Sequence, residues 1–320
     1  MTFTNVVDVP LKNYLVATAL KPERYSATSL FTPFETEKDD VLLIDWDKAN
    51  KAGQLHQVES NGDAESVTVK FEFTSSGVKS KVISVRSFIS DKDKRNATDP
   101  IASILDKAII SNLMKILITY RENDASALAQ NASNYGTNTE ALVGTAQWSD
   151  PASTPYTDLS RWSSAVSDQA EADTNFVFLA KDVFSELANH QDTIDRLKTI
   201  NEKVLTPDAL IRLLTNKIDL NPEQIVIGRS SYNTSITGTK TQTPFWSKTA
   251  ILAYQNPNAK NMMLQKTFGQ MFYPKGFNAI KIYKYTKDEL RGGYYIEVEI
   301  AYCFKIIAQD CGFLGTAVIA

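Results

Sequence analysis

The longest periodic pattern in the sequence runs from Asp99 to about residue 135. Asp99-Pro100 is a favourable helix start, because aspartate caps free backbone N–H groups and proline fits the first helical position. Apolar residues then recur at intervals of three and four, at Ile101, Ile104, Leu105, Ala108, Ile109, Leu113, Ile116, Leu117 and Tyr120. A helix of this length spans roughly 50 Å and is expected to act as a strut. The charged run at residues 121–124 leaves a bend or break in it open.

The first 35 residues show no sustained period. Isolated apolar residues are mixed with Pro10, Pro22 and Pro33, which indicates an extended arm rather than a packed element. The beginning of the chain lacks a basic region followed by an apolar core, and no stretch approaches the roughly 18 apolar residues that span a membrane. We therefore expect a protein that is neither secreted by a standard signal nor embedded in a membrane.

A strand and a hairpin are predicted between this arm and the long helix. Residues 41–46 are typical of a short strand, and the polar stretch through residues 61–63 is typical of an exposed loop. Val67, Val69, Phe71 and Phe73 then alternate with polar residues, as in a half-buried strand. Residues 75–77 predict a turn and residues 78–85 the return strand. This hairpin would either lie on another subunit through its apolar face or itself form the edge of the chain's own sheet.

Strands and helices alternate through the middle of the sequence. Helices are expected at residues 158–169, 182–189, 193–199 and 207–215, and buried strands at 175–180, 223–228 and 248–254. This alternation predicts a compact α/β unit. The chain then returns to strand at residues 280–283, and residues 294–308 are long for a single strand. The last segment is predicted to be a long, curved member of a sheet elsewhere in the subunit.

Composition excludes several functional classes. The 34 basic and 37 acidic residues give a net charge of -3, the reverse of the basic footprint of a dedicated DNA-binding domain. Cys303 and Cys311 have neither a disulfide framework nor a zinc-ligand spacing around them, and His56 and His190 lie far away in sequence. Buried reduced thiols are therefore the expected role of the two cysteines.

No pattern of catalytic or ligand-binding residues emerges. A Ser or Cys nucleophile needs a nearby histidine base. His56 falls in the polar loop and His190 at a helix end, where a solvated or capping role is expected. Phosphate-binding glycine motifs are absent, and the pairs Asp91-x-Asp93 and Glu297-x-Glu299 offer too few ligands for a metal. Trp148, Trp162 and Trp246 are expected to fill cores or interfaces. The sequence predicts a protein that is not an enzyme, with no cofactor and no metal.

Three passages carry a family resemblance. Gln147-Trp-Ser-Asp-Pro151 precedes a short amphipathic helix, and Asn175-Phe-Val-Phe-Leu-Ala180 precedes Val183-Phe184, Leu187 and His190. The most specific passage is Gln224-Ile-Val-Ile-Gly-Arg-Ser-Ser-Tyr-Asn233, followed by Phe245-Trp246-x-Lys248-x-Ala250-x-Leu252-Ala253-Tyr254. Together with the order of the predicted elements, these passages resemble the major capsid proteins of tailed double-stranded-DNA bacteriophages. Their shared architecture is the Hong Kong 97 fold.

This resemblance implies an α+β capsid fold with five parts. They are an N-terminal arm at 1–35, an E-loop hairpin at 36–98, a spine helix with the first part of the P-domain at 99–174, an axial A-domain at 175–278 and C-terminal P-domain strands at 279–320. The arm and the hairpin would lie on neighbouring subunits, and the long final strand would join the P-domain sheet. Trp46, Val69, Phe71 and Phe73 are the candidate inter-subunit contacts.

The implied function is that of a coat protein. Hexamers and pentamers of the chain would assemble in the host cytoplasm into the icosahedral shell of a virion, enclosing double-stranded DNA without sequence-specific binding and without a membrane. Many relatives begin with a scaffold-like segment of about a hundred residues, whereas here the arm-like region begins at Met1. A separate scaffolding protein is therefore expected, with a portal and optional decoration proteins. Lys70, Lys79 and Lys81 lie in the hairpin, but no partner asparagine is identified, so isopeptide crosslinking is not carried over.

Two alternatives remain open at the level of the sequence. An encapsulin-type nanocompartment shares the fold but holds cargo enzymes, and a soluble α/β enzyme would have a site that matches no familiar motif. The contents of an assembled particle would distinguish the first alternative from a phage coat. Persistently monomeric protein would favour the second.

Overall fold

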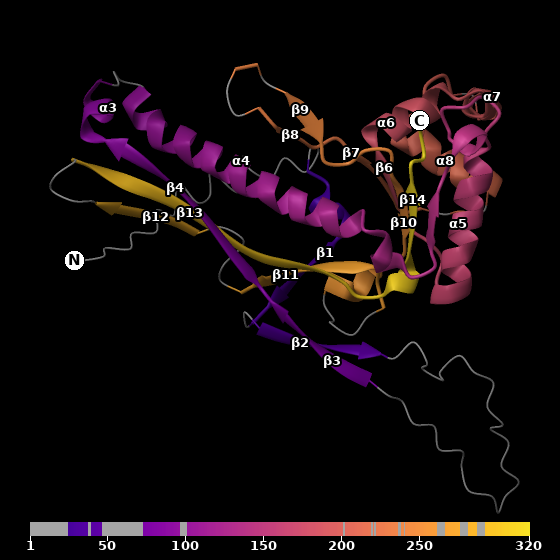
Figure 1. Ribbon diagram of the computed structural model, residues 1–320, viewed down its shortest axis with the longest axis horizontal. Helices are drawn as coiled ribbons and strands as arrows, with labels where there is room; N and C mark the ends of the chain where they lie inside the picture. The colour runs from indigo at the N-terminus through magenta and orange to yellow at the C-terminus, as the bar shows by residue number, and fades with distance from the viewer. Residues whose placement is uncertain are drawn as a thin grey trace, which may run out of the picture.

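The computed structural model describes twelve stretches of the chain. They comprise residues 25–37, 40–46, 73–96, 101–200, 202–218, 220, 222–235, 238–239, 241–260, 266–275, 281–286 and 292–320. Two five-stranded sheets, a long helix and a projecting two-stranded ribbon organise these residues (Figure 1). No helix among the described residues is long and apolar enough to cross a membrane.

The predicted strut is the helix α4, Ile101–Ala129. Its 29 residues span about 43 Å at 1.5 Å per residue, and the helix continues without a break through residues 121–124. It ends earlier than residue 135, and the 3-10 helix η2, Ala132–Tyr135, follows it. Asp99 and Pro100, the expected start, lie outside the described residues.

The long sheet lies under α4. Its order is β1-β11-β13-β12, and β4 also pairs with β13. The strands are β1 Thr32–Thr36, β11 Gly269–Pro274, β13 Gly293–Ile306, β12 Lys281–Thr286 and β4 Lys81–Ser90. The 14-residue β13 confirms the long strand predicted near the C-terminus. Alternate residues of β13 are buried beneath α4, namely Tyr294, Ile296, Val298, Ile300 and Tyr302.

Part of the predicted arm is a packed element, so the expectation for residues 25–35 is wrong. The short helix α2, Ala27–Leu30, precedes β1, which pairs in parallel with β11. Leu30 and Phe31 are completely buried, and Pro33 sits in an edge strand, where a missing N–H is tolerated. A partner strand more than 230 residues further along the chain leaves no local signal, and for that reason the sequence shows no period here.

The predicted hairpin turn at residues 75–77 is also wrong. These residues lie inside β3, Phe73–Lys79, which pairs antiparallel with β2, Asp40–Trp46. The expected return strand is instead β4, which pairs with β13 and leads into the helix α3, Asp91–Asn96. Gly77 and the small Ser75 and Ser76 accept an extended backbone as readily as a turn, and the pairing with β2 decides between the two. The strand predicted at 41–46 is confirmed as β2, whereas the loop at 61–63 lies outside the described residues.

The second sheet has the order β5-β14-β10-β6-β7. Its strands are β5 Thr139–Ala141, β14 Gly312–Thr316, β10 Ala250–Ala253, β6 Phe176–Ala180 and β7 Gln224–Gly228. The helices α5 Pro155–Ala170, α6 Lys181–Asn189, α7 Gln191–Thr199 and α8 Pro207–Ile218 gather at this end of the molecule (Figure 1). The predicted alternation of strands and helices is confirmed.

Strand pairing crosses the boundaries drawn from the sequence. β5 and β14 come from ranges expected to build one sheet with β13, yet both lie in the second sheet. β11 comes from the range assigned to the A-domain, yet it pairs with β13. The division into arm, E-loop, P-domain and A-domain therefore stays a prediction, and the sheets themselves are built from segments far apart in sequence.

The three tryptophans Trp148, Trp162 and Trp246 fill the core, each at most 1% exposed. Trp148 stacks on Trp162 with ring centroids 5.7 Å apart, and Trp162 stacks on Phe313 at 5.2 Å. Their indole N–H groups are satisfied, since Trp148 donates to Asp158 and Trp162 to Glu140. The smaller elements are the strands β8 Ser231–Asn233 and β9 Gln242–Pro244 and the 3-10 helices η3 Gly144–Ala146, η4 Pro257–Lys260 and η5 Gln309–Cys311.

Candidate assembly interface

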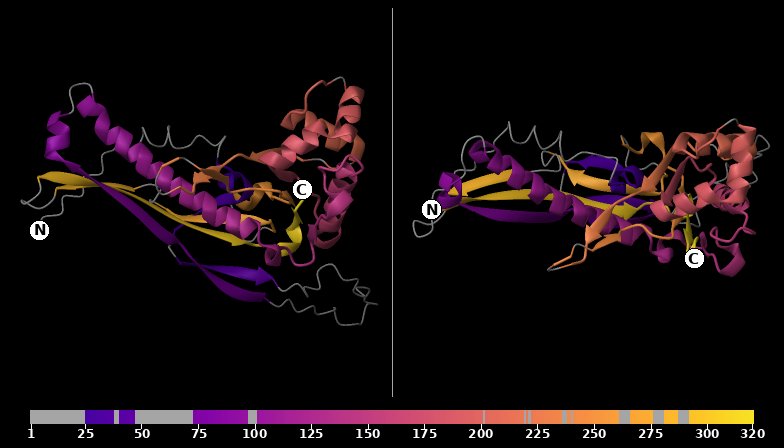
Figure 2. Two further views of the ribbon diagram at one scale, coloured as in Figure 1. Left: turned by 45° about the horizontal axis from the view of Figure 1, so that its top comes forward. Right: turned by 90° about the horizontal axis from the view of Figure 1, so that it is seen from above.

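The ribbon formed by β2 and β3 projects from the body on the side of the long sheet away from α4 (Figure 2). Seven residue pairs, from Asp40 opposite Lys79 to Trp46 opposite Phe73, form one antiparallel ladder. The base of the ribbon packs on the body, where Val78 is buried against Phe272. An isolated two-stranded ribbon is marginally stable in water. A surface beyond its own ladder is needed to hold the projecting part in place.

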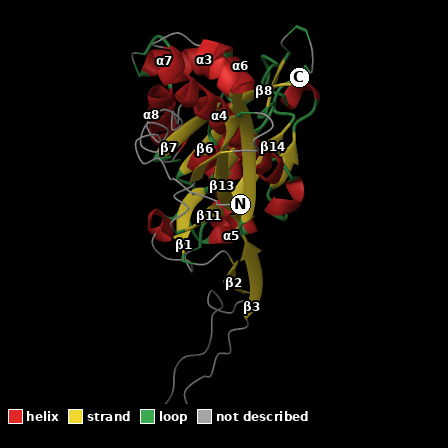
Figure 3. Ribbon diagram, turned by 90° about the vertical axis from the view of Figure 1, so that its left-hand side faces the viewer, coloured by secondary structure: helices red, strands yellow, loops and turns green. Residues whose placement is uncertain are grey.

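The register of the ribbon assigns apolar residues to both of its faces. Directly opposed residues share a face, and successive residues alternate between faces. Leu42, Ile44, Trp46 and Phe73 therefore take register positions on one face, and Val41 and Leu43 share the other face with Val78. Seen end-on, β2 and β3 extend below the rest of the molecule (Figure 3).

The structure brings two of the four predicted contact residues together. Trp46 and Phe73 come from strands 27 residues apart in sequence and are direct cross-strand partners. Val69 and Phe71 lie outside the described residues. Sequence reasoning missed Leu42 and Ile44, because it paired the second strand of the ribbon with residues 78–85 instead of 41–46. The apolar run at residues 41–44 predicted a strand but gave no signal of its partner.

The face of the long sheet that points away from α4 mixes aromatic and charged groups. Phe88 of β4 pairs with Tyr295 of β13, and their rings lie 5.0 Å apart. Arg86, the cross-strand partner of Glu297, places its guanidinium 5.3 Å from the Tyr295 ring. Glu297 and Glu299 share this face, as their spacing predicts, and are half-buried rather than fully solvated. This face offers apolar area and oppositely charged cross-strand neighbours to an incoming surface.

A buried carboxylate on α4 joins three distant segments. Glu122 is 1% exposed, and its Oε1 accepts hydrogen bonds from the backbone N–H of Ser26 (3.0 Å) and the hydroxyls of Ser26 and Ser230 (both 2.8 Å). The indole N–H of Trp246 donates to the same oxygen at 2.7 Å. The backbone N–H of Ala27 donates to Oε2 at 2.9 Å. Because the first N–H groups of a helix have no partner within it, Glu122 caps α2 from outside.

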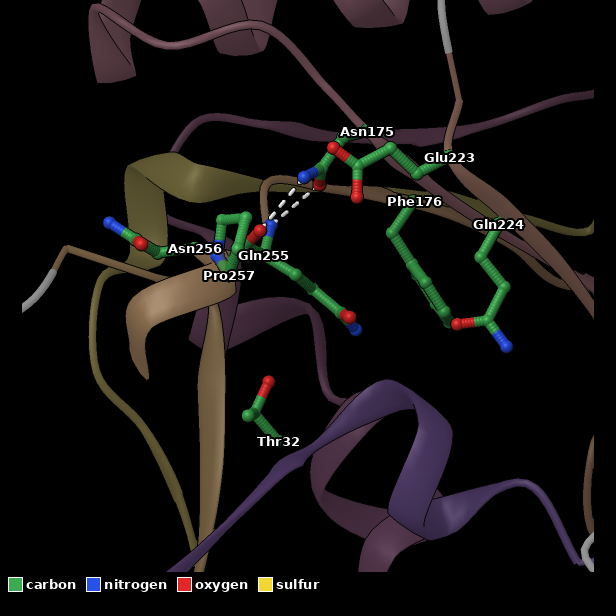
Figure 4. Close-up of a pocket in the computed structure, with 8 residues that line it drawn as sticks. All are labelled: Thr32, Asn175, Phe176, Glu223, Gln224, Gln255, Asn256 and Pro257. Atoms are coloured by element: carbon green, nitrogen blue, oxygen red, sulfur yellow. Dashed lines mark hydrogen bonds between the residues drawn. The ribbon is translucent and has the colours of Figure 1, made fainter. Parts of the chain in front are cut away.

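The other end of α2 is held by an amide. Gln255 donates from Nε2 to the carbonyl oxygens of Ser29 and Leu30, both at 2.9 Å. Asn175 and Gln255 exchange two hydrogen bonds of 2.8 Å, from Asn175 Nδ2 to the Gln255 carbonyl and from the Gln255 N–H to Asn175 Oδ1 (Figure 4). These groups line an open pocket of about 210 Å³ together with Thr32, Phe176, Glu223, Gln224, Asn256 and Pro257. The helix α2 is therefore clamped at both ends.

His190 has a structural role. It is 6% exposed and sits at the start of α7, where its Nδ1 accepts from the backbone N–H of Asp192 at 3.2 Å. Its Nε2 therefore carries the proton, and the Ser153 hydroxyl lies 3.2 Å from it. The capping role expected for this histidine is confirmed, although the side chain is buried rather than solvated. His56 lies outside the described residues.

The two cysteines are free thiols, as expected, although only Cys311 is completely buried. Burial raises the pKa of the Cys311 thiol to about 12, and nearby Asp310 adds to the effect. Burial also raises the pKa of half-buried Cys303. Among the described residues, no three His, Cys, Asp or Glu side chains are placed to share a metal ion. Asp93 of the Asp91-x-Asp93 pair accepts a hydrogen bond from Ser90 at the start of α3.

Comparison with known proteins assigns the fold. No protein-family profile and no curated protein matches the sequence. Among solved structures, the chain is similar over 98% of both chains to a phage-related protein from Bordetella bronchiseptica RB50, with a TM-score of 0.75 and 18% identity. It is also similar to the capsid of cyanophage P-SCSP1u over 90% of this chain and 86% of that chain, with a TM-score of 0.57 and 10% identity.

A third similar structure is an encapsulin rather than a phage protein. The encapsulin SrpI of Synechococcus elongatus PCC 7942 matches 92% of this chain and 88% of its own, with a TM-score of 0.52 and 8% identity. The chain therefore has the α+β fold of phage capsid and encapsulin shells, the Hong Kong 97-type fold that the sequence predicted. At these identities the likeness establishes the fold alone.

Proposed function

We propose that the chain is a coat protein that assembles from many copies into a closed icosahedral shell. The observation that carries this proposal is the projecting two-stranded ribbon, whose register assigns Leu42, Ile44, Trp46 and Phe73 to one face and Val41 and Leu43 to the other. A projecting apolar ribbon gains stability only from a second surface. The similarity to capsid chains over about nine-tenths of both lengths supports the same conclusion.

The second surface is the open face of the long sheet on a neighbouring copy. The ribbon emerges on that side of the sheet, so subunits arranged side by side in a shell would place a ribbon against the Phe88–Tyr295 face of the next one. Buried aromatic residues near the centre of an interface contribute most of the binding energy. Trp46 and Phe73 are the proposed anchors, with Val69 and Phe71 as further candidates from the adjoining segment.

We further propose that this shell is the head of a tailed phage and encloses double-stranded DNA. The passages at 224–233 and 245–254 support this finer assignment through their resemblance to tailed-phage capsid proteins. The proposed partners are further copies in hexamers and pentamers, a separate scaffolding protein, a portal and optional decoration proteins. Assembly would take place in the host cytoplasm, with no membrane and no enzymatic step.

An encapsulin-type compartment is the second candidate, because the SrpI encapsulin has the same fold. The two functions differ in what the shell holds. Particles purified with the products of neighbouring genes would contain nuclease-protected double-stranded DNA in the first case and a protein cargo in the second. Gel analysis of particle contents after nuclease treatment separates them.

Electron microscopy of the purified chain, alone and with its genomic neighbours, tests the proposed function. We expect shells or capsomers from the unmodified protein, and the double variant Trp46→Asp with Phe73→Asp should abolish them while the subunit stays folded. Val204→Asp is the matched control, because Val204 is 67% exposed in the loop before α8 and lies outside the ribbon. Protein that stays monomeric under every condition, or shells that form normally from the double variant, would overturn the proposal.

A further inference from the structure

The open pocket beside Asn175 and Gln255 lies at a junction of four segments. The first residues of β1, β6 and β7 meet there with the segment that follows β10 (Figure 4). The pocket has a volume of about 210 Å³, below the roughly 300–1,000 Å³ of pockets that hold drug-sized molecules. Its size suits one small molecule or one side chain.

Hydrogen bonds within the fold fix which atoms this pocket presents. Gln255 Nε2 donates to the carbonyl oxygens of Ser29 and Leu30, which can only accept. The amide nitrogen of Gln255 is therefore committed to α2, and its Oε1 has no hydrogen bond to any described residue. The Asn175 side chain is occupied by its two hydrogen bonds with the backbone of Gln255. Gln255 thus contributes an acceptor oxygen to the pocket.

Thr32 and Glu223 add two further oxygen groups. Thr32 is 6% exposed, and its hydroxyl points toward the pocket and makes no hydrogen bond within the described part of the chain (Figure 4). Glu223 directs its carboxylate toward the same space (Figure 4), and none of the described Lys, Arg or His side chains forms an ion pair with it. Three segments far apart in sequence therefore bring a carboxylate, an amide oxygen and a hydroxyl to one pocket.

This set of oxygens calls for a cation that donates hydrogen bonds. A carboxylate and an amide oxygen can only accept, and a hydroxyl can accept as well. A primary ammonium group carries three donors, no acceptor and one positive charge, so it matches all three oxygens and pairs with the carboxylate. Phe176 and Pro257 also line the pocket and supply apolar surface for the methylene groups next to the nitrogen. Ca²⁺ and Mg²⁺ fit less well, because they take six or more oxygen ligands.

From this geometry we infer that the pocket binds a primary ammonium group at the end of an unbranched alkyl chain, held by Glu223, Gln255 and Thr32. A free alkylamine and a lysine side chain of a second copy of the chain both offer this chemistry. The inference does not depend on the proposed coat function, because the pocket is built within one chain.

Saturation-transfer NMR of n-butylammonium chloride with the full-length, unassembled chain tests the inference. We expect a dissociation constant on the order of millimolar for this small ligand. Glu223→Gln keeps the shape of the side chain and removes its charge, so binding should weaken on the order of tenfold or more. Glu186→Gln is the matched control, because Glu186 is an exposed glutamate on α6 that forms no ion pair with a described residue, and it should bind like the unmodified chain.

A second ligand separates hydrogen bonding from charge alone. Butyltrimethylammonium at equal ionic strength has the same charge and alkyl chain but no N–H donor, so it should also bind on the order of tenfold more weakly. The inference is overturned if n-butylammonium does not bind, if Glu223→Gln binds it as well as the unmodified chain does, or if butyltrimethylammonium binds equally well. Stronger binding of Mg²⁺ or Ca²⁺ than of n-butylammonium at this pocket would overturn it too.

Carbodiimide coupling of assembled protein, with no amine added, distinguishes the two sources of the ammonium group. If a lysine of a second copy fills the pocket, mass spectrometry should find Glu223 joined to a lysine in a product of dimer mass, and n-butylammonium should bind only the unassembled chain. If a free amine fills it, that product should be missing, and n-butylammonium should bind both forms. The titration of the unassembled chain tests the pocket whether or not shells form, so its failure is distinct from a failure of the coat function.

Discussion

The Glu122 junction gives the sharpest test of how the fold is held together. The substitution Glu122→Ala removes an acceptor of five hydrogen bonds from a site that is 1% exposed. The two serine hydroxyls can rotate toward other acceptors. The N–H groups of Ser26, Ala27 and Trp246 are fixed in direction and would remain buried without a partner.

The magnitude follows from these three fixed donors. Each buried donor left unsatisfied costs about 1–3 kcal/mol. Removal of the buried carboxylate recovers part of its own desolvation cost, so the net loss for Glu122→Ala should be about 3–5 kcal/mol. Glu122→Gln should cost less, about 1–3 kcal/mol, because an amide oxygen in the place of Oε1 keeps up to four of the five bonds.

Urea unfolding of the unassembled chain measures both variants, with the midpoint and the slope fitted separately. Asn123→Ala is the matched control, because Asn123 is the exposed neighbour of Glu122 on the same helix, and its loss should change the free energy of unfolding by about 0.5 kcal/mol or less. The Ala variant should also be cleaved faster by trypsin after Arg24, since its α2 start is no longer held. The reasoning would be refuted if Glu122→Ala lowered the free energy of unfolding by no more than about 1 kcal/mol beyond the Asn123→Ala control. Equal losses for Glu122→Ala and Glu122→Gln would refute it as well.

Two further measurements probe other parts of the structure. Gly228→Ala should destabilise the subunit by about 1–3 kcal/mol, because the new Cβ would lie 2.5 Å from the Phe178 ring and 2.9 Å from that of Trp246. Gly77→Ala should be nearly neutral, because a Cβ at this position would have no atom within 4 Å. Equal losses of stability for Gly228→Ala and Gly77→Ala in thermal unfolding would contradict the packing argument. Burial raises the pKa of Tyr156 and of Cys311 to about 12 each, so the unfolded state loses protons first and stability should fall by roughly 2–4 kcal/mol as pH rises from 9 to 11. Urea midpoints that stay constant over this range would disprove the assignment.

Local patterns predicted much of the fold correctly. The strut at α4, the strands β6, β7 and β10 and the long β13 all follow from apolar spacing and from capping residues, which act over a few positions of the chain. The family passages pointed to a capsid fold that the structural comparisons confirm, although no sequence comparison finds a match.

The candidate interface was predictable only in part. Trp46 and Phe73 were predicted as aromatic anchors of an inter-subunit interface, and their position as direct cross-strand partners required the β2–β3 register.

The sequence by itself determined the strongly periodic helices and strands, because those depend on spacing within a few turns or a few residues, and it missed α2, β1 and the strand at 75–77. Only the tertiary structure decided which segments pair, since hydrogen-bond ladders between distant strands leave no mark on local composition. The parallel pairing of β1 with β11, the union of β5 and β14 with the second sheet and the extended path of residues 75–77 are all of this kind. Glu122 shows the same division. A glutamate within a helical pattern can lie on the surface or be buried, and the sequence does not distinguish the two. The five hydrogen bonds from Ser26, Ala27, Ser230 and Trp246, all distant in sequence, decide that it is buried.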